Sequence, residues 1–302
     1  MARAPQVLGV GHTSWDHQFS IQAFPPTATK IAAQRYSSST GGMTANACVA
    51  AARLGAQVRI ASPVGADDVP WFGAYFAKEG VDASAVVGVP QADSSVSAVM
   101  VDALGQRLIV SHRGSALHQA PAFDTSLVDG TEVLLTDPRC VLWAEAALKR
   151  ARQLQRVSIL DADAAPTEDL QRLVGLSQWA VFSQAGLAAF AAGASTRQGL
   201  AAALDAGAEV AVVTRDEQPL WWQRRGGQAQ EMAGFSVRPV VDTTAAGDTF
   251  HGALAVALGE GFDDRRALRF AAAAAALKCL QPGGVMGAPR RAQVDAFLAS
   301  QT

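Results

Sequence analysis

Hydrophobic positions in the second half of the chain form short runs, each followed by a longer segment with helical spacing. Apolar runs rich in β-branched residues predict buried strands at residues 133–136, 157–160, 179–182 and 210–214. Apolar positions at every third or fourth residue predict helices at 143–153, 167–175, 185–191 and 196–206. Regular alternation of strand and helix favours a parallel sheet with helices on both faces.

Similar elements are predicted towards both ends of the chain. They are strands at 6–10 and 58–61, helices at 44–54 and 71–79, a hairpin at 220–223 and 228–232, a long alanine-rich helix at 263–280 and a last helix at 291–299. No linker, repeat or low-complexity segment divides the chain. We therefore expect an α/β fold with a mostly parallel central sheet, formed by residues 1–302 as a single domain.

Two insertions, at about 12–40 and 95–112, interrupt this alternation with segments that mix polar and apolar residues. The strands predicted within them are 17–21, 30–37, 95–102 and 107–111. Antiparallel strands with one solvated face do not join a parallel core easily. We expect them to form a small antiparallel sheet that covers the core.

Composition excludes several classes of function. The chain has 302 residues, 49% of them hydrophobic, and a formal net charge of −2, so no global positive field attracts nucleic acid or an anionic membrane. Its three cysteines, Cys48, Cys140 and Cys279, are far apart and form neither a zinc motif nor a disulfide framework. The longest apolar stretch, residues 270–277, is too short to span a bilayer, and the apolar run near the N-terminus is too short to predict a signal peptide. We expect a soluble cytoplasmic protein.

The strongest chemical signal is the segment Val240-Val-Asp-Thr-Thr-Ala-Ala-Gly-Asp-Thr-Phe-His-Gly-Ala253. Small and polar residues open a helix after what we predict to be an apolar strand, so free backbone amides would face a ligand at the positive end of the helix dipole. Asp248, one residue past Gly247, is placed to accept a proton from an attacking hydroxyl. The alternative is a plain helix start, capped by Thr243 or Thr244.

A second signal is the segment Gly41-Gly-Met-Thr-Ala-Asn46, which precedes the first predicted helix. Paired glycines allow a polar ligand to approach the main chain, and the Asn46 amide offers a donor and an acceptor to hydroxyl groups. Asp16 follows the first strand, where ligands gather in open α/β sheets. Alternatively, both features are ordinary turns.

Together these segments resemble the ribokinase/PfkB family of carbohydrate kinases, and the resemblance covers nearly the whole chain. It rests on Gly41 to Gly55, on Val64-Gly-Ala-Asp-Asp68 and on Asp242 to Ala253. It implies a ribokinase-like three-layer sandwich with a lid over the sugar, ATP and Mg²⁺ as cofactors, a small sugar as partner and a homodimer formed through the lid.

The resemblance also implies roles for particular residues. Asp248 would be the catalytic base, and the amides of Ala245, Ala246 and Gly247 would hold the γ-phosphate. The sugar ligands would be Asp16, Gly41, Gly42 and Asn46, and the nucleotide ligands would be Ser183, Thr214, Asp216, Gly247, Lys278, Gly283 and Gly284. Asp242 would help to hold the metal.

Other segments, among them Leu135-Thr-Asp-Pro-Arg139 and Ile159-Leu-Asp-Ala-Asp163, are similar to the sulfofructose kinase branch, which is near the ketohexokinases. This implies transfer of phosphate to the 1-hydroxyl of a ketose whose C6 carries a sulfonate. Lys30 and Arg139 match positions that could hold such an anion; otherwise they are surface charges. The alternatives are a kinase of a neutral sugar such as ribose or fructose, or a non-catalytic sugar or nucleotide sensor.

Several positions depart from the family pattern. Ala245 replaces a glycine, at a cost of about 1–2 kcal/mol if this position needs a positive φ. The nucleotide loop, residues 214–219, lacks both usual glycines and carries Asp216 and Glu217, which should repel phosphate unless they turn away. The segment 183–186 lacks the usual acidic residue, and 111–113 lacks an asparagine expected in the sulfonate branch.

Two other nucleotide-binding classes are excluded by the sequence. A dinucleotide fingerprint after the first strand would need glycine or alanine at position 14, where Ser14 stands. No phosphate-binding loop of the G-x-x-x-x-G-K-[ST] type occurs in the chain.

Overall fold

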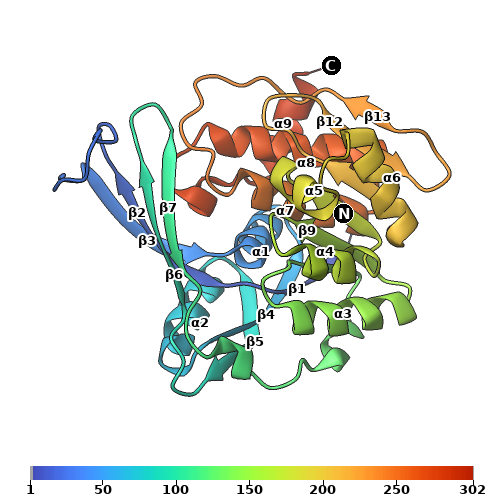
Figure 1. The fold of residues 1–302 in the computed structure, drawn as a ribbon, viewed down its shortest axis with the longest axis horizontal. Coiled ribbons are helices and arrows are strands. Elements are labelled where there is room, and N and C mark those ends of the chain that lie inside the picture. The colour runs from blue at the N-terminus through green and yellow to red at the C-terminus, as the bar shows by residue number, and fades with distance from the viewer. Residues whose placement is uncertain (1–2, 302) are drawn as a thin grey trace.

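The computed structural model describes residues 3–301, which form a nine-stranded sheet between two layers of helices and a separate four-stranded sheet (Figure 1). Neighbouring strands of the large sheet are parallel except where β12 and β13 join its edge. The predicted α/β fold with a mostly parallel central sheet is confirmed. In sheet order the strands are β13 (Gln230–Met232), β12 (Leu220–Arg224), β11 (Val210–Val213), β10 (Trp179–Phe182), β9 (Val157–Ala162), β8 (Val133–Thr136), β1 (Gln6–Val10), β4 (Gln57–Gly65) and β5 (Val81–Val89).

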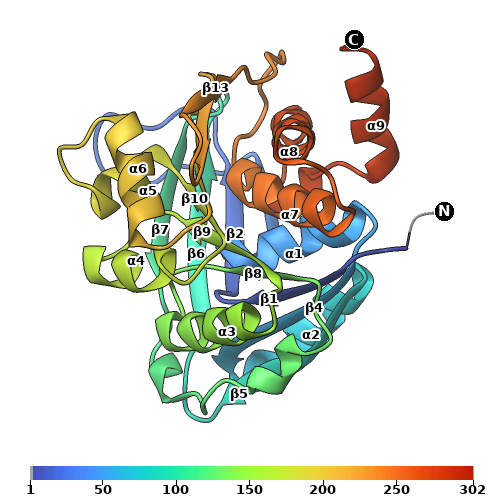
Figure 2. The same cartoon turned by 90° about the vertical axis from the view of Figure 1, so that its right-hand side faces the viewer.

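Helices cover both faces of this sheet (Figure 2). Successive residues of β1 belong to opposite hydrophobic clusters, Val7 to one and Leu8 to the other, which explains why the central strands read as continuous apolar runs. One layer contains α1 (Met43–Arg53), α2 (Val69–Lys78), α7 (Ala246–Gly259), α8 (Asp264–Cys279) and α9 (Arg291–Ala299). The other contains α3 (Val141–Gln153), α4 (Thr167–Val174), α5 (Gln184–Phe190) and α6 (Thr196–Ala206).

Helices α1 and α7 are unusually close to each other, and a glycine makes this possible. A Cβ atom on Gly252 of α7 would lie 2.3 Å from the main-chain oxygen of Ala47 on α1. Any side chain there would force the helices apart. The close packing brings residues from distant parts of the chain into one site.

The four-stranded sheet, which we call the lid, stands away from the body of the molecule (Figure 1). Its order is β3 (Arg35–Gly41), β2 (Ser14–Ser20), β6 (Ser95–Val101) and β7 (Arg107–His112). The pairs β2–β3 and β6–β7 are antiparallel, as predicted, but the middle pair β2–β6 is parallel, because the two hairpin-like halves enter the sheet in the same direction. The strand predicted at 30–37 begins only at Arg35.

Two further expectations differ from the structure. Strand β5 was not predicted, because it mixes polar and apolar residues and lacks the apolar run of the central strands. This mixture is explained by its place at the edge of the sheet. The apolar strand predicted before α7 is absent, since residues 233–245 lie outside helices and strands. Among the described residues, no helix is both long and hydrophobic enough to cross a bilayer.

Candidate active site

Asp248 and Asn46 meet at the junction of α7 and α1. The Asn46 side-chain amide donates to Asp248 Oδ2 at 2.7 Å, across 202 residues of sequence. Burial, followed by the neighbouring Asp161 carboxylate, raises the pKa of Asp248 to about 8, although the Asn46 hydrogen bond opposes the rise. Asp248 is therefore a carboxylate with the proton affinity of a general base that works near neutral pH.

The turn before Asp248 has a backbone conformation that favours glycine. Ala245 precedes the first residue of α7 with φ 62° and ψ 16°, in the left-handed region, so alanine here costs about 1–2 kcal/mol. No side chain caps this helix, so the alternative of a plain helix start capped by Thr243 or Thr244 is not what the structure has. The first turn of α7 is therefore stabilised by the preceding backbone turn and not by a capping side chain.

Only part of the predicted anion hole has free amides. The Ala246 amide donates to the Thr243 carbonyl at 3.2 Å, so it is already used within the turn. The amides of Gly247 and Asp248 belong to the first turn of α7, where a helix has no internal acceptor. Gly247 is exposed, and these two amides lie at the positive end of the α7 dipole.

The Asp242 carboxylate lies at the centre of a group of donors. Its Oδ1 accepts from the Thr244 amide at 2.8 Å, and its Oδ2 accepts from the amides of Gly283 and Gly284 at 3.0 Å each. The lid reaches the same oxygen through Gln18 Nε2 at 3.3 Å. Burial alone would raise the pKa of Asp242, but Lys278 and these amides outweigh it and lower the pKa.

Lys278, predicted from the resemblance to bind the nucleotide, is fully buried beneath this group. Its ammonium donates to the main-chain oxygens of Asp242 at 2.7 Å and Gln281 at 3.2 Å, and it lies 3.3 Å from Asp242 Oδ2. Gly283 and Gly284, also predicted as nucleotide ligands, use their amides on Asp242. Asp242, predicted to help to hold a metal, is surrounded by hydrogen-bond donors instead, an environment that suits no divalent cation.

Asp16 faces the core from the middle of the lid strand β2. Ser14 Oγ donates to its Oδ1 at 2.8 Å, and burial raises the pKa of Asp16. A Cβ on Gly41 would lie 2.0 Å from the Asp16 carboxylate, so glycine at 41 makes room for this side chain, whereas Gly42 is favoured by its backbone conformation, with φ 92°. The narrow hollow between lid and core is lined by Asp16, Gln18, Ser39, Thr40, Asn46, Val99, Thr244, Gly284 and Val285. The structure thus brings four predicted sugar ligands together: Asp16 and Asn46 line the hollow, Gly41 lies against the Asp16 carboxylate, and Gly42 follows Gly41 in the chain.

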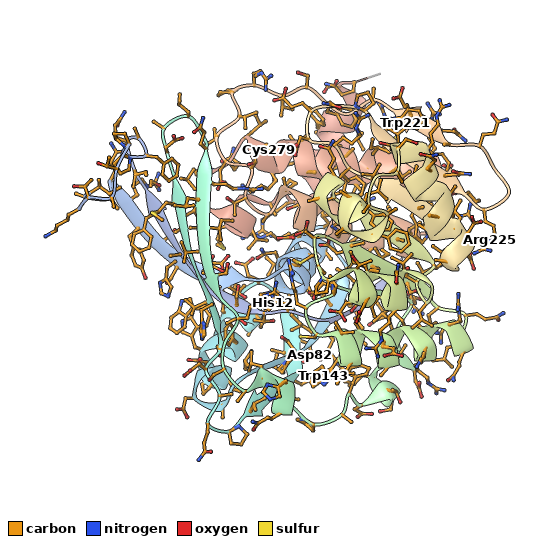
Figure 3. The ribbon with its side chains drawn as sticks, in the orientation of Figure 1. His12, Asp82, Trp143, Trp221, Arg225 and Cys279 are labelled. Carbon is orange, nitrogen blue, oxygen red and sulfur yellow. The ribbon has the colours of Figure 1, made fainter. Side chains whose placement is uncertain are left out.

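A second cluster of charged residues lies at the carboxyl ends of β8 and β9, and of its members sequence reasoning singled out Arg139 but none of the carboxylates. Asp137 is fully buried and accepts from Thr44 Oγ1 at 2.6 Å and from the main-chain amide of His12 at 2.8 Å. His12 lies where the lid meets the core (Figure 3). Asp161 lies 3.3 Å from His251 Nδ1, which is 2.7 Å from the Gly247 carbonyl oxygen. Burial, then Asp163 and Asp137, raises the pKa of Asp161 well above its ordinary value. The sequence feature that could have identified these carboxylates is an aspartate at the end of an otherwise apolar strand.

Arg139 belongs to this cluster, but Lys30 does not. Arg139 forms a long ion pair with Asp163, at 3.7 Å, and its side chain is 17% exposed. Burial, followed by the Arg139 guanidinium, lowers the pKa of Arg113, so the two cations are neighbours. Lys30 is exposed on the segment between β2 and β3 and has no hydrogen bond or ion pair within residues 3–301.

The residues predicted for the nucleotide loop lie after β10 and β11. Ser183 caps α5 by accepting from the Gly186 amide, and it donates to Asp163 Oδ1 at 2.7 Å. Thr214 donates its amide to the Phe182 carbonyl at 2.9 Å. Asp216 has φ 50°, a left-handed conformation at a position where the family pattern has glycine. The adjacent acid, Glu217, has turned to Arg238, which binds it with two nitrogens at 2.7 and 3.0 Å.

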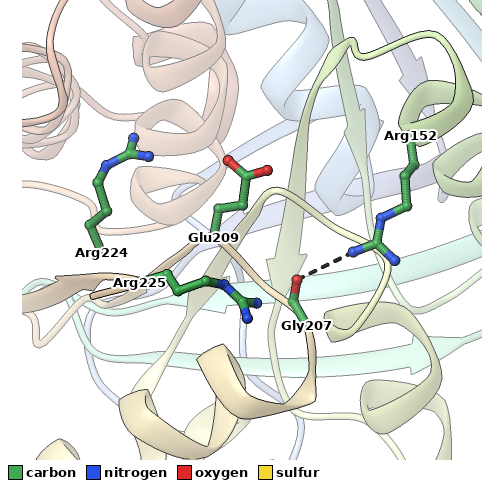
Figure 4. Close-up of a pocket in the computed structure, with 5 residues that line it drawn as sticks. All are labelled: Arg152, Gly207, Glu209, Arg224 and Arg225. Atoms are coloured by element: carbon green, nitrogen blue, oxygen red, sulfur yellow. Dashed lines mark hydrogen bonds between the residues drawn. The ribbon is translucent and has the colours of Figure 1, made fainter. Parts of the chain in front are cut away.

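A larger hollow of about 570 Å³ lies elsewhere (Figure 4). It lies at the amino end of β11, opposite the end where Thr214 follows, and Arg225 is far from the lid (Figure 3). Its arginines are already occupied: Arg224 pairs with Asp264, Arg225 binds carbonyls at the end of α6, and Arg152 binds the Gly207 carbonyl. The hollow under the lid is therefore the candidate active site.

Comparisons with known proteins agree with this geometry. A family model described as pfkB family carbohydrate kinase matches residues 4–291. Ribokinase from Haemophilus influenzae is 28% identical over 303 residues, which cover 96% of this chain and 97% of that protein. A crystal structure from Agrobacterium tumefaciens, described as a putative ribokinase, superposes with a TM-score of 0.94 at 29% identity and covers 99% of both chains. Ribokinase of Arabidopsis thaliana, complexed with ribose and ATP, has a TM-score of 0.84 at 24% identity and covers 98% of this chain and 99% of its own.

Proposed function

The chain belongs to the pfkB family of carbohydrate kinases, and on that basis we propose that it transfers the γ-phosphate of ATP to a sugar hydroxyl with Asp248 as general base. The observation that carries the proposal is the Asp248 carboxylate, whose pKa is raised to about 8 beside free amides at the start of α7. A base with this pKa takes a proton readily as the hydroxyl attacks.

The surrounding residues define what each part would do. The sugar would lie in the hollow under the lid, with its hydroxyls on Asp16 and Asn46. Asn46 also holds the Asp248 carboxylate in position through its hydrogen bond. The amides of Gly247 and Asp248 would bind the transferring phosphoryl group, whose negative charge the α7 dipole stabilises.

ATP brings its own requirement for a cation. Mg²⁺ would neutralise charge on the triphosphate during transfer. Within residues 3–301 no three acidic, histidine or cysteine side chains are grouped as metal ligands. We therefore propose that phosphate oxygens and water supply most of the ligands, as magnesium commonly prefers.

We further propose that the acceptor is a ketose with an anionic end, such as 6-deoxy-6-sulfofructose. The support is the electrostatic repulsion between Arg113 and Arg139, since two cations that repel each other favour an anion near both. The long Arg139–Asp163 pair leaves this arginine incompletely bound. We leave Lys30 out of this site, because its ammonium is exposed and unpaired in the described part of the chain.

A sugar panel tests both levels of the proposal. With Mg-ATP, wild-type protein should phosphorylate at least one ketose or pentose; no turnover on any sugar would favour a non-catalytic binding protein. Arg139→Ala should then raise KM for sulfofructose about 10- to 100-fold, the scale of one or two charged hydrogen bonds, and leave KM for fructose nearly unchanged. Equal losses on both sugars would indicate a neutral substrate.

We also propose that the lid forms a homodimer through its outer face. Strand alternation places Trp15, His17 and Phe19 on the side of β2 opposite Asp16. On the same side Tyr36 and Val110 are each 59% exposed and Leu108 is 49% exposed. Large exposed apolar side chains that lie together on one face are typical of a protein–protein interface. Sedimentation should show a dimer that Val110→Lys converts to monomer, whereas a monomeric wild type would overturn the assignment.

A further inference from the structure

Lys278 is a buried charge that the proposed reaction does not use. It lies in the last turn of α8, and its side chain is 0% exposed. Burial lowers the pKa of Lys278, but Asp242 opposes this and favours the charged form. A nucleotide could not reach the ammonium without displacing the residues that enclose it. A buried ammonium group needs hydrogen-bond partners that compensate for the loss of its hydration.

Those partners are all oxygen atoms, and they come from two loops. The main-chain oxygens of Asp242 and Gln281 lie 2.7 and 3.2 Å from Nζ, and Asp242 Oδ2 lies at 3.3 Å. Carbonyl and carboxylate oxygens are the ligands that also bind simple cations in proteins. The ammonium therefore occupies a cavity whose lining would suit a free monovalent cation.

The position of this charge links it to the proposed phosphate site. Asp242 binds the Thr244 amide, which starts the turn that leads to Gly247, and it binds the amides of Gly283 and Gly284 on the facing loop. Without a counterion, the buried Asp242 carboxylate would carry an uncompensated negative charge that repels an incoming phosphate. Lys278 both neutralises the carboxylate and ties the two loops to the end of α8.

We propose that Lys278 is a built-in monovalent cation, a positioning residue that orders the turn at 242–247 through Asp242. The inference rests on the proposed kinase function. It has two consequences: the wild-type enzyme needs no free monovalent cation, and removal of the lysine side chain leaves an oxygen-lined site that binds K⁺ or NH₄⁺.

The kinetic test compares wild type, Lys278→Ala and Lys278→Met in K⁺, NH₄⁺ or tetramethylammonium chloride at equal ionic strength, with Mg-ATP and the best sugar. Wild-type kcat should vary less than about twofold among the salts. Lys278→Ala should lose about 100-fold in tetramethylammonium, the scale of a displaced catalytic group, and regain at least about tenfold in K⁺ or NH₄⁺. Lys278→Met should lose activity in every salt, because its apolar side chain fills the space. Lys149→Ala, on the surface of α3, is the matched control and should behave as wild type.

A second measurement needs no activity. In thermal unfolding, K⁺ in place of tetramethylammonium should raise the Tm of Lys278→Ala by about 3 °C and leave the Tm of wild type and Lys278→Met unchanged. A wild-type enzyme stimulated several-fold by K⁺, or a folded Lys278→Ala with neither rescue nor a Tm shift, would overturn the proposal. If wild type phosphorylates no sugar, the kinase proposal fails, while the Tm comparison still decides whether the cation site exists.

Discussion

The turn at residues 242–247 and the loop at residues 214–219 both lie on the side of the core where the parallel strands end, but they are stabilised in different ways. The turn is held from below by a buried Lys278–Asp242 pair and by four donors on the Asp242 carboxylate. The loop is exposed, and its charged contact, between Glu217 and Arg238, lies on the surface with side chains that are 69% and 63% exposed. Charges out of water cost much when a partner is lost, whereas surface pairs contribute little.

This difference has a consequence for function. The groups that we propose to act in phosphoryl transfer lie at the start of α7, where buried polar contacts hold the turn in place. The loop at 214–219 tolerates replacement of the family's glycines, because Glu217 turns its charge to Arg238 and Asp216 adopts the left-handed conformation in place of glycine. We therefore expect large effects from changes around the turn and small ones from changes in the loop.

The largest effect should come from Asp248→Asn. Asparagine preserves the size of the side chain but cannot accept the hydroxyl proton, so kcat should fall by at least about 100-fold. Steady-state kinetics with saturating ATP and sugar measure this directly. A variant that keeps more than a tenth of wild-type kcat would remove Asp248 from the reaction.

The same variant shows whether the loss is local. In the folded protein the pKa of Asp248, about 8, lies above its value of about 3.9 in an unfolded chain. Between these values the unfolded state releases the proton first, so this group lowers the free energy of unfolding as pH rises from 4 to 8. Asp248→Asn should therefore have a Tm equal to wild type at pH 4 and above wild type at pH 8. A lower Tm at both pH values would mean that the substitution disrupts the fold.

The next effect concerns pH. Because the base must be ionised, wild-type kcat/KM should fall about tenfold per pH unit below pH 8. Asn46→Ala removes the hydrogen bond that favours the ionised form, so it should move this limb to higher pH. A flat profile from pH 6 to 9 would show that the Asp248 carboxylate is not the group that controls the rate.

Ala245→Gly should have a moderate effect of the opposite sign. Glycine relieves a left-handed alanine, a gain of about 1–2 kcal/mol, but it loses more chain entropy on folding, about 0.4–1 kcal/mol. The net increase in the free energy of unfolding should be about 0.5–1 kcal/mol, measured by chemical denaturation. Ala246→Gly, one residue later at a negative φ, is the control and should destabilise the protein.

The smallest effect is expected in the nucleotide loop. Glu217→Gln removes one partner of an exposed pair, so KM for ATP should change by no more than about twofold. Arg238→Gln leaves Glu217 unpaired and should raise KM for ATP more than Glu217→Gln does. If both variants changed KM tenfold or more, the loop would be as important for binding as the turn.

The sequence predicted the core better than it predicted the site. Strands such as β8 and β10 were predicted within a residue or two, because four apolar residues between helices leave few alternatives. Asp248, Asn46 and Asp16 were selected from local motifs, and the structure brings them together. The parallel pairing of β2 with β6 could not be predicted, since it depends on where two distant insertions meet.

The site residues that were missed share one property: their importance depends on burial. Asp137 follows the apolar strand β8 and Asp161 lies near the end of β9, and only the fold shows that their carboxylates are buried. Lys278 was predicted as a nucleotide ligand from the resemblance, but its burial was not predicted, because a lysine in an alanine-rich helix usually faces water. Its burial follows from the packing of α8 against the loops at 242 and 281, which no local pattern reports.

The pairing of Asn46 with Asp248 also constrains how the protein is made. The two side chains are separated by 202 residues, so at a typical synthesis speed of about 5–20 residues per second the ribosome needs roughly 10–40 s to add the second after the first. During that interval α1 has been synthesised, but its partner α7 has not. The nascent chain therefore carries an incomplete apolar surface around Ala47 for tens of seconds, and chaperone contacts with the newborn protein should concentrate there until α7 emerges.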